Sequence, residues 1–389
     1  MKSTNILPLI LLITVLTLKQ GRAVEIFGYN ESQFMPVVLN DDYSQLFSNK
    51  LRVDLQSNEI EHVSFGANFD YLAYEGRTDW NLLDYLPDNV TEVVSPGNDS
   101  LFAFAYRDTI FLDNAFVKFS ESIFDITAGK QQISPGTGYA WNPTDLFNTK
   151  DIVDPTYEQP GHTAVRVDAT LSSRYTAIAM YFPESDWELS GKLFRFKGKL
   201  GHFDYSAIYV ERMWQLSDFI YFQTINGRRH LYGGDFAGEL LGLGVWGEFA
   251  YNTLKGHADF GEYLLGADYT FDDGTYVMAE YLHNDLGKSD SKEYDLNDWL
   301  RYYIAESRTI SQDNMYIYFD YSLNDLIHLS NSVIVSLSDF SMSLIPSMQY
   351  SMYQNIELNL FLNINAGKDE TAFSNKQGYG GIARLKVYF

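Results

Sequence analysis

The sequence predicts an all-β fold, a transmembrane antiparallel up-and-down β-barrel of about 18 strands. Three observations carry this prediction: apolar and polar residues alternate with period two along much of the chain, helical spacing is nowhere sustained, and all the long connections fall at one end of the predicted sheet. The net charge of -23 works against binding nucleic acid, and the absence of cysteine argues against a fold stapled by disulfides.

The chain begins with an expected signal peptide, residues 1–23, which leaves residues 24–389 for the barrel. Lys2 gives a positive start, and Ala23 is a small residue of the kind that a signal peptidase reads. The apolar run from Ile6 to Leu18 is shorter than the roughly 20 apolar residues that a membrane-spanning helix needs. An uncleaved N-terminal anchor is the alternative.

The predicted strands are segments in which one face is apolar and the other polar. The alternation is clearest in the segments 51–56, 63–71 and 164–171, and each predicted strand is close to the roughly 10 residues that a tilted membrane strand needs. The predicted strands start near residues 24, 49, 62, 109, 122, 162, 174, 188, 201, 228, 242, 260, 275, 313, 326, 341, 354 and 379.

The connections between these strands indicate which end of the barrel is which. An odd number of shorter links separates each long connection from the next, so all long connections lie at one end. This asymmetry is typical of outer-membrane barrels, with short periplasmic turns and long extracellular loops. A soluble β-sandwich or propeller is the alternative, but nothing else in the chain could cover its apolar faces, and no propeller repeat occurs. The long connections are predicted at 75–108, 132–161, 213–227, 285–312 and 366–378.

The last strand carries the most specific pattern. Aromatic residues stand at both of its ends, where the interfacial girdles of a membrane barrel lie. One face of this strand is formed by Tyr379, Gly381, Ala383, Leu385, Val387 and Phe389. In this end the chain resembles the bacterial outer-membrane porin superfamily, and the Gly129-Lys130-Gln131 strand end is similar to porin-like channels of the alginate-export type.

The resemblance implies a location and a set of partners. It places the protein in the outer membrane, in contact with outer-membrane lipid and lipopolysaccharide. It also implies that the barrel-assembly machinery reads Phe389 at the C-terminus.

The motifs of enzymes and cofactor sites are absent or out of context. Gly242–Gly247 matches GxGxxG, but it leads into the strand-like Glu248–Tyr251 where a dinucleotide site needs a helix, so we expect a hairpin. The seven histidines are scattered, and the sequence contains neither GxSxG nor HExxH. No cofactor, metal or catalytic residue is predicted, although a hydrolase built from loop residues stays open.

The polar face of the strands is expected to line the lumen. Basic residues gather on the early strands and on the last strand, and no Lys or Arg is expected in the lumen between about 231 and 321. The predicted basic lining is Arg52, Lys118, Arg166, Arg195, Lys197, Arg212, Arg384 and Lys386, and the predicted acidic lining is Asp168, Asp235, Glu239, Glu248, Asp268, Glu280 and Asp320. These charges either set up a field across a pore or pair across strands.

The connection 132–161 is the candidate for a constriction of the lumen. It carries Tyr139, Trp141, Asp145 and Phe147, and its apolar cluster could dock it against the inner wall. The alternative is a cap over the mouth of the barrel, because apolar loop clusters also pack on themselves.

These expectations favour one function and leave two others open. A lumen inside about eighteen strands is too wide to be filled by side chains alone, so we expect passive diffusion of small polar solutes through it. An adhesin or a polysaccharide-export barrel would instead use the loops 75–108 and 285–312 as its working surface. A loop-borne hydrolase is the third hypothesis.

Overall fold

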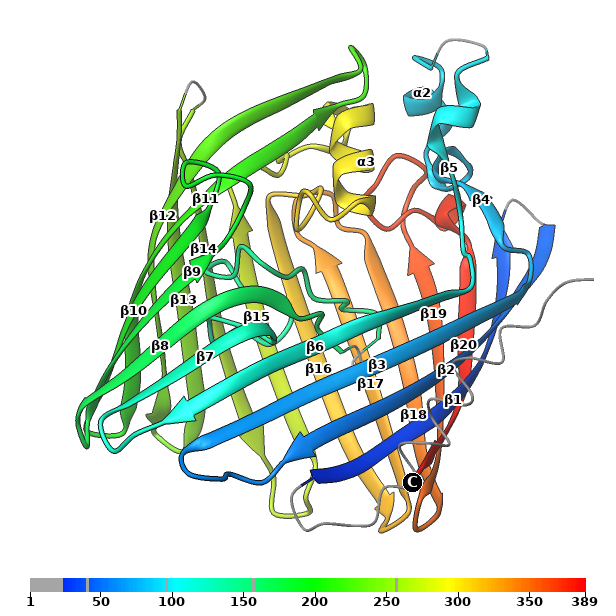
Figure 1. The fold of residues 1–389 in the computed structure, drawn as a ribbon. Helices are drawn as coiled ribbons and strands as arrows, with labels where there is room; N and C mark the ends of the chain where they lie inside the picture. The colour runs from blue at the N-terminus through cyan, green and yellow to red at the C-terminus, as the bar shows by residue number, and fades with distance from the viewer. Residues whose placement is uncertain (1–23, 40–41, 95–96, 155–157, 256–257) are drawn as a thin grey trace, which may run out of the picture.

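The protein is described by a computed structural model over residues 24–39, 42–94, 97–154, 158–255 and 258–389. The predicted signal peptide lies outside these residues. Eighteen strands form one sheet in which each strand is antiparallel to its neighbours, and β1 pairs with β20 to close the barrel (Figure 1). The predicted fold class is confirmed.

The first half of the barrel consists of β1 (Val24–Leu39), β2 (Asp42–Ser57), β3 (Val63–Gly76), β6 (Thr109–Ser120), β7 (Phe124–Gln131), β8 (His162–Ser172), β9 (Tyr175–Phe182), β10 (Gly191–Leu200) and β11 (Phe203–Asp218). The second half consists of β12 (Gln223–Leu240), β13 (Leu243–Leu254), β14 (Phe260–Thr270), β15 (Tyr276–Asn284), β16 (Asp313–Asn324), β17 (Ile327–Ser336), β18 (Met342–Tyr353), β19 (Ile356–Ala366) and β20 (Tyr379–Tyr388).

The loops carry short elements of their own. These are β4 (Asp79–Asn81), η1 (Leu82–Tyr85), α2 (Asp88–Thr91), η2 (Asp99–Phe102), β5 (Ala103–Ala105), η3 (Ser291–Glu293), α3 (Leu296–Tyr303) and η4 (Asn375–Gln377). No helix in the described part of the chain has the length and hydropathy needed to cross a membrane.

The long connections after β3, β7, β15 and β19 all leave the barrel at the same end, as the alternation predicted. The expected long loop at 213–227 is wrong. There β11 and β12 stay paired from Arg212↔Arg229 out to Asp218↔Gln223, so only four residues connect them. Where the hairpin projects past the barrel, water reaches both faces, and the alternation fades while the backbone pairing continues.

The glycine motif Gly242–Gly247 forms a hairpin, as expected. Leu241 and Gly242 both have positive φ, 56° and 82°, and they form the two-residue turn between β12 and β13. Positive φ at both central positions is the geometry that matches the twist of paired strands. No helix follows this turn, so the context of a dinucleotide site is missing.

Three of the long loops pack together above the barrel, and we call this assembly the cap. It joins the loops 77–108, 285–312 and 367–378 (Figure 1). Their shared apolar core consists of Leu86, Val90, Phe102, Tyr294, Leu296, Trp299, Leu300, Ile310 and Ala372. Within the cap, Asp295 and Asp298 form a capping box at the start of α3, which satisfies two backbone N–H groups there.

Candidate functional site: the lumen and its inner loop

We call the loop 132–161 the inner loop, and its described residues, 132–154 and 158–161, lie inside the barrel against its inner wall. Ile133 and the neighbouring Phe147 join an apolar cluster that includes Leu193 and Val210 of the wall. Leu193 is 1% exposed whereas the next residue, Phe194, is 56% exposed, so the cluster lies on the inner face of the strands. The apolar residues of the inner loop therefore dock it within the lumen.

Two buried carboxylates on the wall accept hydrogen bonds from the backbone of the inner loop. Glu280 on β15 accepts from the N–H groups of Tyr139, Ala140 and Trp141 at 2.6, 2.9 and 3.0 Å. Its side chain also accepts from the indole N–H of Trp246 at 2.8 Å. These bonds satisfy backbone groups that have lost water, and an ionised acceptor makes them stronger than neutral ones.

Glu248 on β13 also accepts hydrogen bonds from residues of the inner loop. It accepts from the N–H groups of Gly138 at 2.6 Å and Thr144 at 3.1 Å, and from the Thr144 hydroxyl at 2.9 Å. Glu248 and Glu280, both predicted as acidic lining, are thus engaged by the inner loop.

On the opposite wall the roles are exchanged. The wall supplies Lys and Arg side chains there, and the inner loop supplies the carboxylates that pair with them. Glu158 lies 2.9 Å from both Lys50 Nζ and an Arg52 guanidinium nitrogen, and 3.6 Å from Lys386 Nζ. The hydroxyl of Tyr29 donates to it at 2.7 Å. Burial acts to raise the pKa of Glu158, but the charge of Lys50 and the bond from Tyr29 outweigh burial and lower it to about 2.

A second ion pair fixes the same stretch of the loop. Asp154 lies 2.5 Å from an Arg384 guanidinium nitrogen, and Arg384 also contacts Glu31 at 3.4 Å. Three of the predicted basic lining residues, Arg52, Arg384 and Lys386, therefore form ion pairs with the loop. The inner loop is held at both walls of the lumen.

The four residues predicted for the constriction lie in different surroundings. Tyr139 packs with its ring 5.9 Å from those of Tyr316 and Tyr318, and Trp141 is buried beside Tyr316. Phe147 stacks on Phe182 at 4.2 Å. Asp145 turns back to its own loop, where it accepts from the Phe147 N–H at 2.8 Å and from the Asn148 side chain at 2.9 Å. Burial raises the pKa of Asp145.

The other predicted lining residues mostly have partners on the wall itself. The closest contacts are Arg166–Asp168 at 2.6 Å, Arg195–Asp235 at 2.8 Å and Lys118–Asp125 at 2.9 Å. Asp268 accepts from the Tyr276 hydroxyl at 2.8 Å, and Asp320 accepts from the Tyr318 hydroxyl at 3.5 Å. Lys197 and Glu239 are exposed, and Arg212 donates to the backbone carbonyl of Leu146 in the inner loop.

The expectation that no Lys or Arg enters the lumen between 231 and 321 is wrong. Arg308 reaches in from the loop 285–312, places Nε 3.0 Å from Glu262, and donates to the Asp145 carbonyl of the inner loop. The alternation of inward and outward residues along a strand cannot predict a side chain that enters the lumen from a loop. Arg229 was also missed, although it lies on the same face of β12 as Asp235 and the alternation could have found it.

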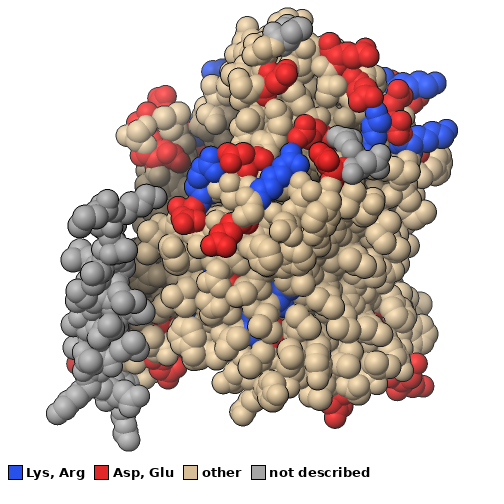
Figure 2. Space-filling view, turned by 90° about the vertical axis from the view of Figure 1, so that its right-hand side faces the viewer, with Lys and Arg blue, Asp and Glu red and all other residues tan. Residues whose placement is uncertain are grey.

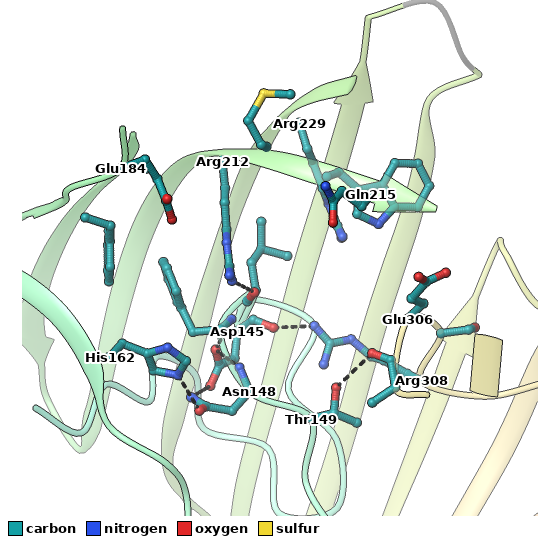
Figure 3. A pocket seen from close by; sticks show the side chains of 18 of the residues that line it. Asp145, Asn148, Thr149, His162, Glu184, Arg212, Gln215, Arg229, Glu306 and Arg308 are labelled. Atoms are coloured by element: carbon teal, nitrogen blue, oxygen red, sulfur yellow. Dashed lines mark hydrogen bonds between the residues drawn. The ribbon is translucent and has the colours of Figure 1, made fainter. Parts of the chain in front are cut away.

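Above the inner loop the lumen holds a cavity of about 1020 Å³, which we call the vestibule. Figure 3 shows Arg212, Arg229 and Arg308 directed into it from three elements, with Glu184 and Glu306 at its margin. The Arg229 guanidinium lies 4.9 Å from the Phe260 ring. The vestibule is lined by positively and negatively charged side chains, by hydrogen-bonding side chains and by aromatic rings. Such a lining suits small polar molecules.

No protein-family model and no curated protein matches this sequence. Among solved structures, the chain is similar to OccAB1 of Acinetobacter baumannii, with a TM-score of 0.60 and 11% identity over 95% of this chain and 99% of that chain. OccAB2 of the same organism has a TM-score of 0.58 and 8% identity over 94% and 98%. OccK5 (OpdH) of Pseudomonas aeruginosa has a TM-score of 0.55 and 12% identity over 95% and 98%. At these identities the likeness shows that the chain shares their fold along nearly its whole length.

Proposed function

We propose that this protein is an outer-membrane channel for the passive diffusion of small polar solutes. The observation that carries the proposal is the inner loop, which buried carboxylates hold at one wall and ion pairs hold at the other. A barrel of eighteen strands encloses more space than side chains can fill. A loop fixed across that space narrows it, and the vestibule above gives solutes a polar entrance.

The arrangement of the barrel supports an outer-membrane location. The cap and the long loops would face the outside, and the short turns and both barrel termini the periplasm. Outer-membrane lipid and lipopolysaccharide would surround the apolar outer face. Phe389 is 59% exposed, while its backbone exchanges two 3.0 Å hydrogen bonds with Gly28. Such an end stays accessible until the barrel closes, which supports recognition of Phe389 by the barrel-assembly machinery.

The surface-binding and polysaccharide-export alternatives receive less support. They require side chains of the loops 75–108 and 285–312 to be available to a ligand. Trp299, Tyr294 and Phe102, three of the large aromatic side chains of these loops, are instead buried in the core of the cap, whereas Leu101 and Tyr106 are exposed. No arrangement of groups in the described loops favours the hydrolase hypothesis.

Reconstitution of the purified protein tests the proposal. In planar bilayers it should give discrete conductance steps, and proteoliposomes should swell in solutions of small sugars or amino acids but not of large dextrans. Folded protein that gives neither steps nor swelling would refute the channel.

A further inference from the structure

Three polar side chains cluster on the outer face of the barrel, where lipid is expected. They are Asn30 and Ser32 on β1 and Asn49 on β2, and we call them the outer cluster. Their neighbours Tyr29 and Lys50 reach Glu158 inside the lumen. Because successive residues of a strand point to opposite faces, the outer cluster faces away from the lumen.

The members of the outer cluster bond to one another. The Asn30 amide donates to Asn49 Oδ1 at 3.1 Å. The Asn49 amide donates to Asn30 Oδ1 at 3.3 Å and to Ser32 Oγ at 2.9 Å. These contacts use one N–H of Asn30 and leave its second N–H, and the hydroxyl hydrogen of Ser32, available to a partner.

The strand register places the outer cluster within the apolar band of the barrel. Asn30 pairs with Val387 and Ser32 with Leu385 on the face of β20 that runs from Tyr379 to Phe389. Ser32 thus lies level with a residue four positions from Phe389, roughly 9 Å along the barrel axis for a tilted strand. Figure 2 shows a broad band with few charges on this side of the molecule, and most charges lie at its rims.

Lipid chains cannot satisfy the outer cluster, since hydrocarbon neither donates nor accepts hydrogen bonds, and the head groups lie at the rims. Protein can, because side-chain amides and hydroxyls bond across protein segments inside membranes, mostly where small residues allow close approach. At the outer cluster the surface is hollowed. The hollow is lined by the apolar residues Phe34, Phe47, Ala73, Leu358, Ala383 and Leu385 and by the polar residues Ser32, Gln33, Ser48, Asn49 and Glu75. The polar groups and the hollow together indicate a protein partner.

We infer that two copies of this chain pack in the membrane through this face, outer cluster against outer cluster, about a two-fold axis. A carboxamide both donates and accepts, so a patch built on Asn30 and Asn49 is complementary to itself. That is the requirement of a two-fold interface, in which both subunits use the same surface. The interface leaves the lumen free, so each copy keeps its own vestibule.

Cysteine cross-linking tests this interface directly, because the natural chain contains no cysteine. Oxidation of Asn49→Cys in membrane vesicles should give a disulfide-linked dimer on gels. The matched control is Leu265→Cys, an exposed apolar position on β14 at the other side of the barrel, which should stay monomeric. A dimer from Leu265→Cys alone, or from neither variant, would overturn the inference.

A second variant separates the interface from folding. Asn30→Leu/Asn49→Leu should shift the mass of the detergent-solubilised protein from two chains to one by light scattering, while heat-modifiable gel mobility shows an intact barrel. Asn331→Leu is the control, because Asn331 lies on the outer face of β17 away from the cluster, and its mass should stay that of a dimer. A monomeric natural protein, or a dimer that persists in the double variant, would refute the proposed contact.

Discussion

At the residue scale, most charges of the lumen wall are engaged, and the inner loop supplies several of the partners. The alternation along the strands predicted that Glu248, Glu280, Arg52 and Arg384 face inward. It could not predict that their partners are backbone N–H groups and carboxylates of the inner loop, because the pattern in a strand carries no information on how a distant loop folds. The same limit explains why Arg308 was missed.

Glu280 is the residue whose loss should loosen the inner loop most. Glu280→Gln replaces one acceptor oxygen by an N–H donor that faces the N–H groups of Tyr139, Ala140 and Trp141. We expect the free energy of unfolding to fall by about 3 kcal/mol, the upper end for buried donors left without an acceptor. Urea titration in detergent measures this change.

The control for Glu280→Gln is Asp320→Asn on the neighbouring strand. Asp320 makes one long hydrogen bond, 3.5 Å from the Tyr318 hydroxyl. Its replacement by Asn should therefore change the free energy of unfolding by less than about 0.5 kcal/mol. Equal losses in the two variants would show that Glu280 does not hold the loop.

Glu158 should make the docking of the inner loop sensitive to acid. Its pKa of about 2 lies below the usual 4.5, so its contribution to stability is complete above about pH 4.5 and is lost as the pH falls toward 2. Between pH 6 and pH 3 the natural protein should therefore lose more stability than Glu158→Gln. Urea midpoints across this range measure the difference, and parallel curves would contradict the assigned ion pairs.

At the scale of elements, the strands follow from alternation alone, and the loops do not. Most strands begin within three residues of the predicted start, because lipid outside and water inside impose period two directly. β2 begins at Asp42 rather than near 49, and β11 and β12 extend through the expected loop 213–227. Both departures lie toward the long-loop end. In the β11–β12 hairpin, which projects past the barrel, solvent on both faces removes the alternation. The packing of three loops into the cap could not be predicted, because the loops show no alternation of apolar and polar residues.

The cap should respond to the loss of Trp299 as one unit, because loops distant in sequence share its core. Trp299 is fully buried, and Trp299→Ala should lower the stability of the cap by about 3 to 5 kcal/mol through the loss of packing. We expect rapid proteolysis within 285–312 while the barrel keeps its heat-modifiable mobility. Ile304→Ala in the same loop, 42% exposed in the natural chain, should leave the cleavage rate unchanged. Similar cleavage of both variants would contradict a cooperative cap.

At the scale of the whole molecule, the paired charges of the wall should set ion selectivity. Replacing Arg166, Arg195 and Arg212 by Gln leaves Asp168 and Asp235 without their guanidinium partners. Carboxylates freed in a confined lumen attract cations, so the reversal potential in a salt gradient should shift toward cation preference.

The matched control for selectivity is Arg107→Gln. Arg107 pairs with Asp79 at the exposed surface of the cap, outside the lumen, and its loss should leave the reversal potential unchanged. An unchanged potential in the triple variant would refute the placement of these arginines in a conducting lumen.

The central claim is that the inner loop narrows an open aqueous lumen. Single-channel conductance of the natural protein, beside a variant in which residues 135–160 are replaced by a short Gly-Ser linker, tests it most directly. The account predicts conductance steps from both proteins and larger steps from the variant, because the loop no longer spans the lumen. Equal steps from the two proteins, or none from either folded barrel, would contradict it.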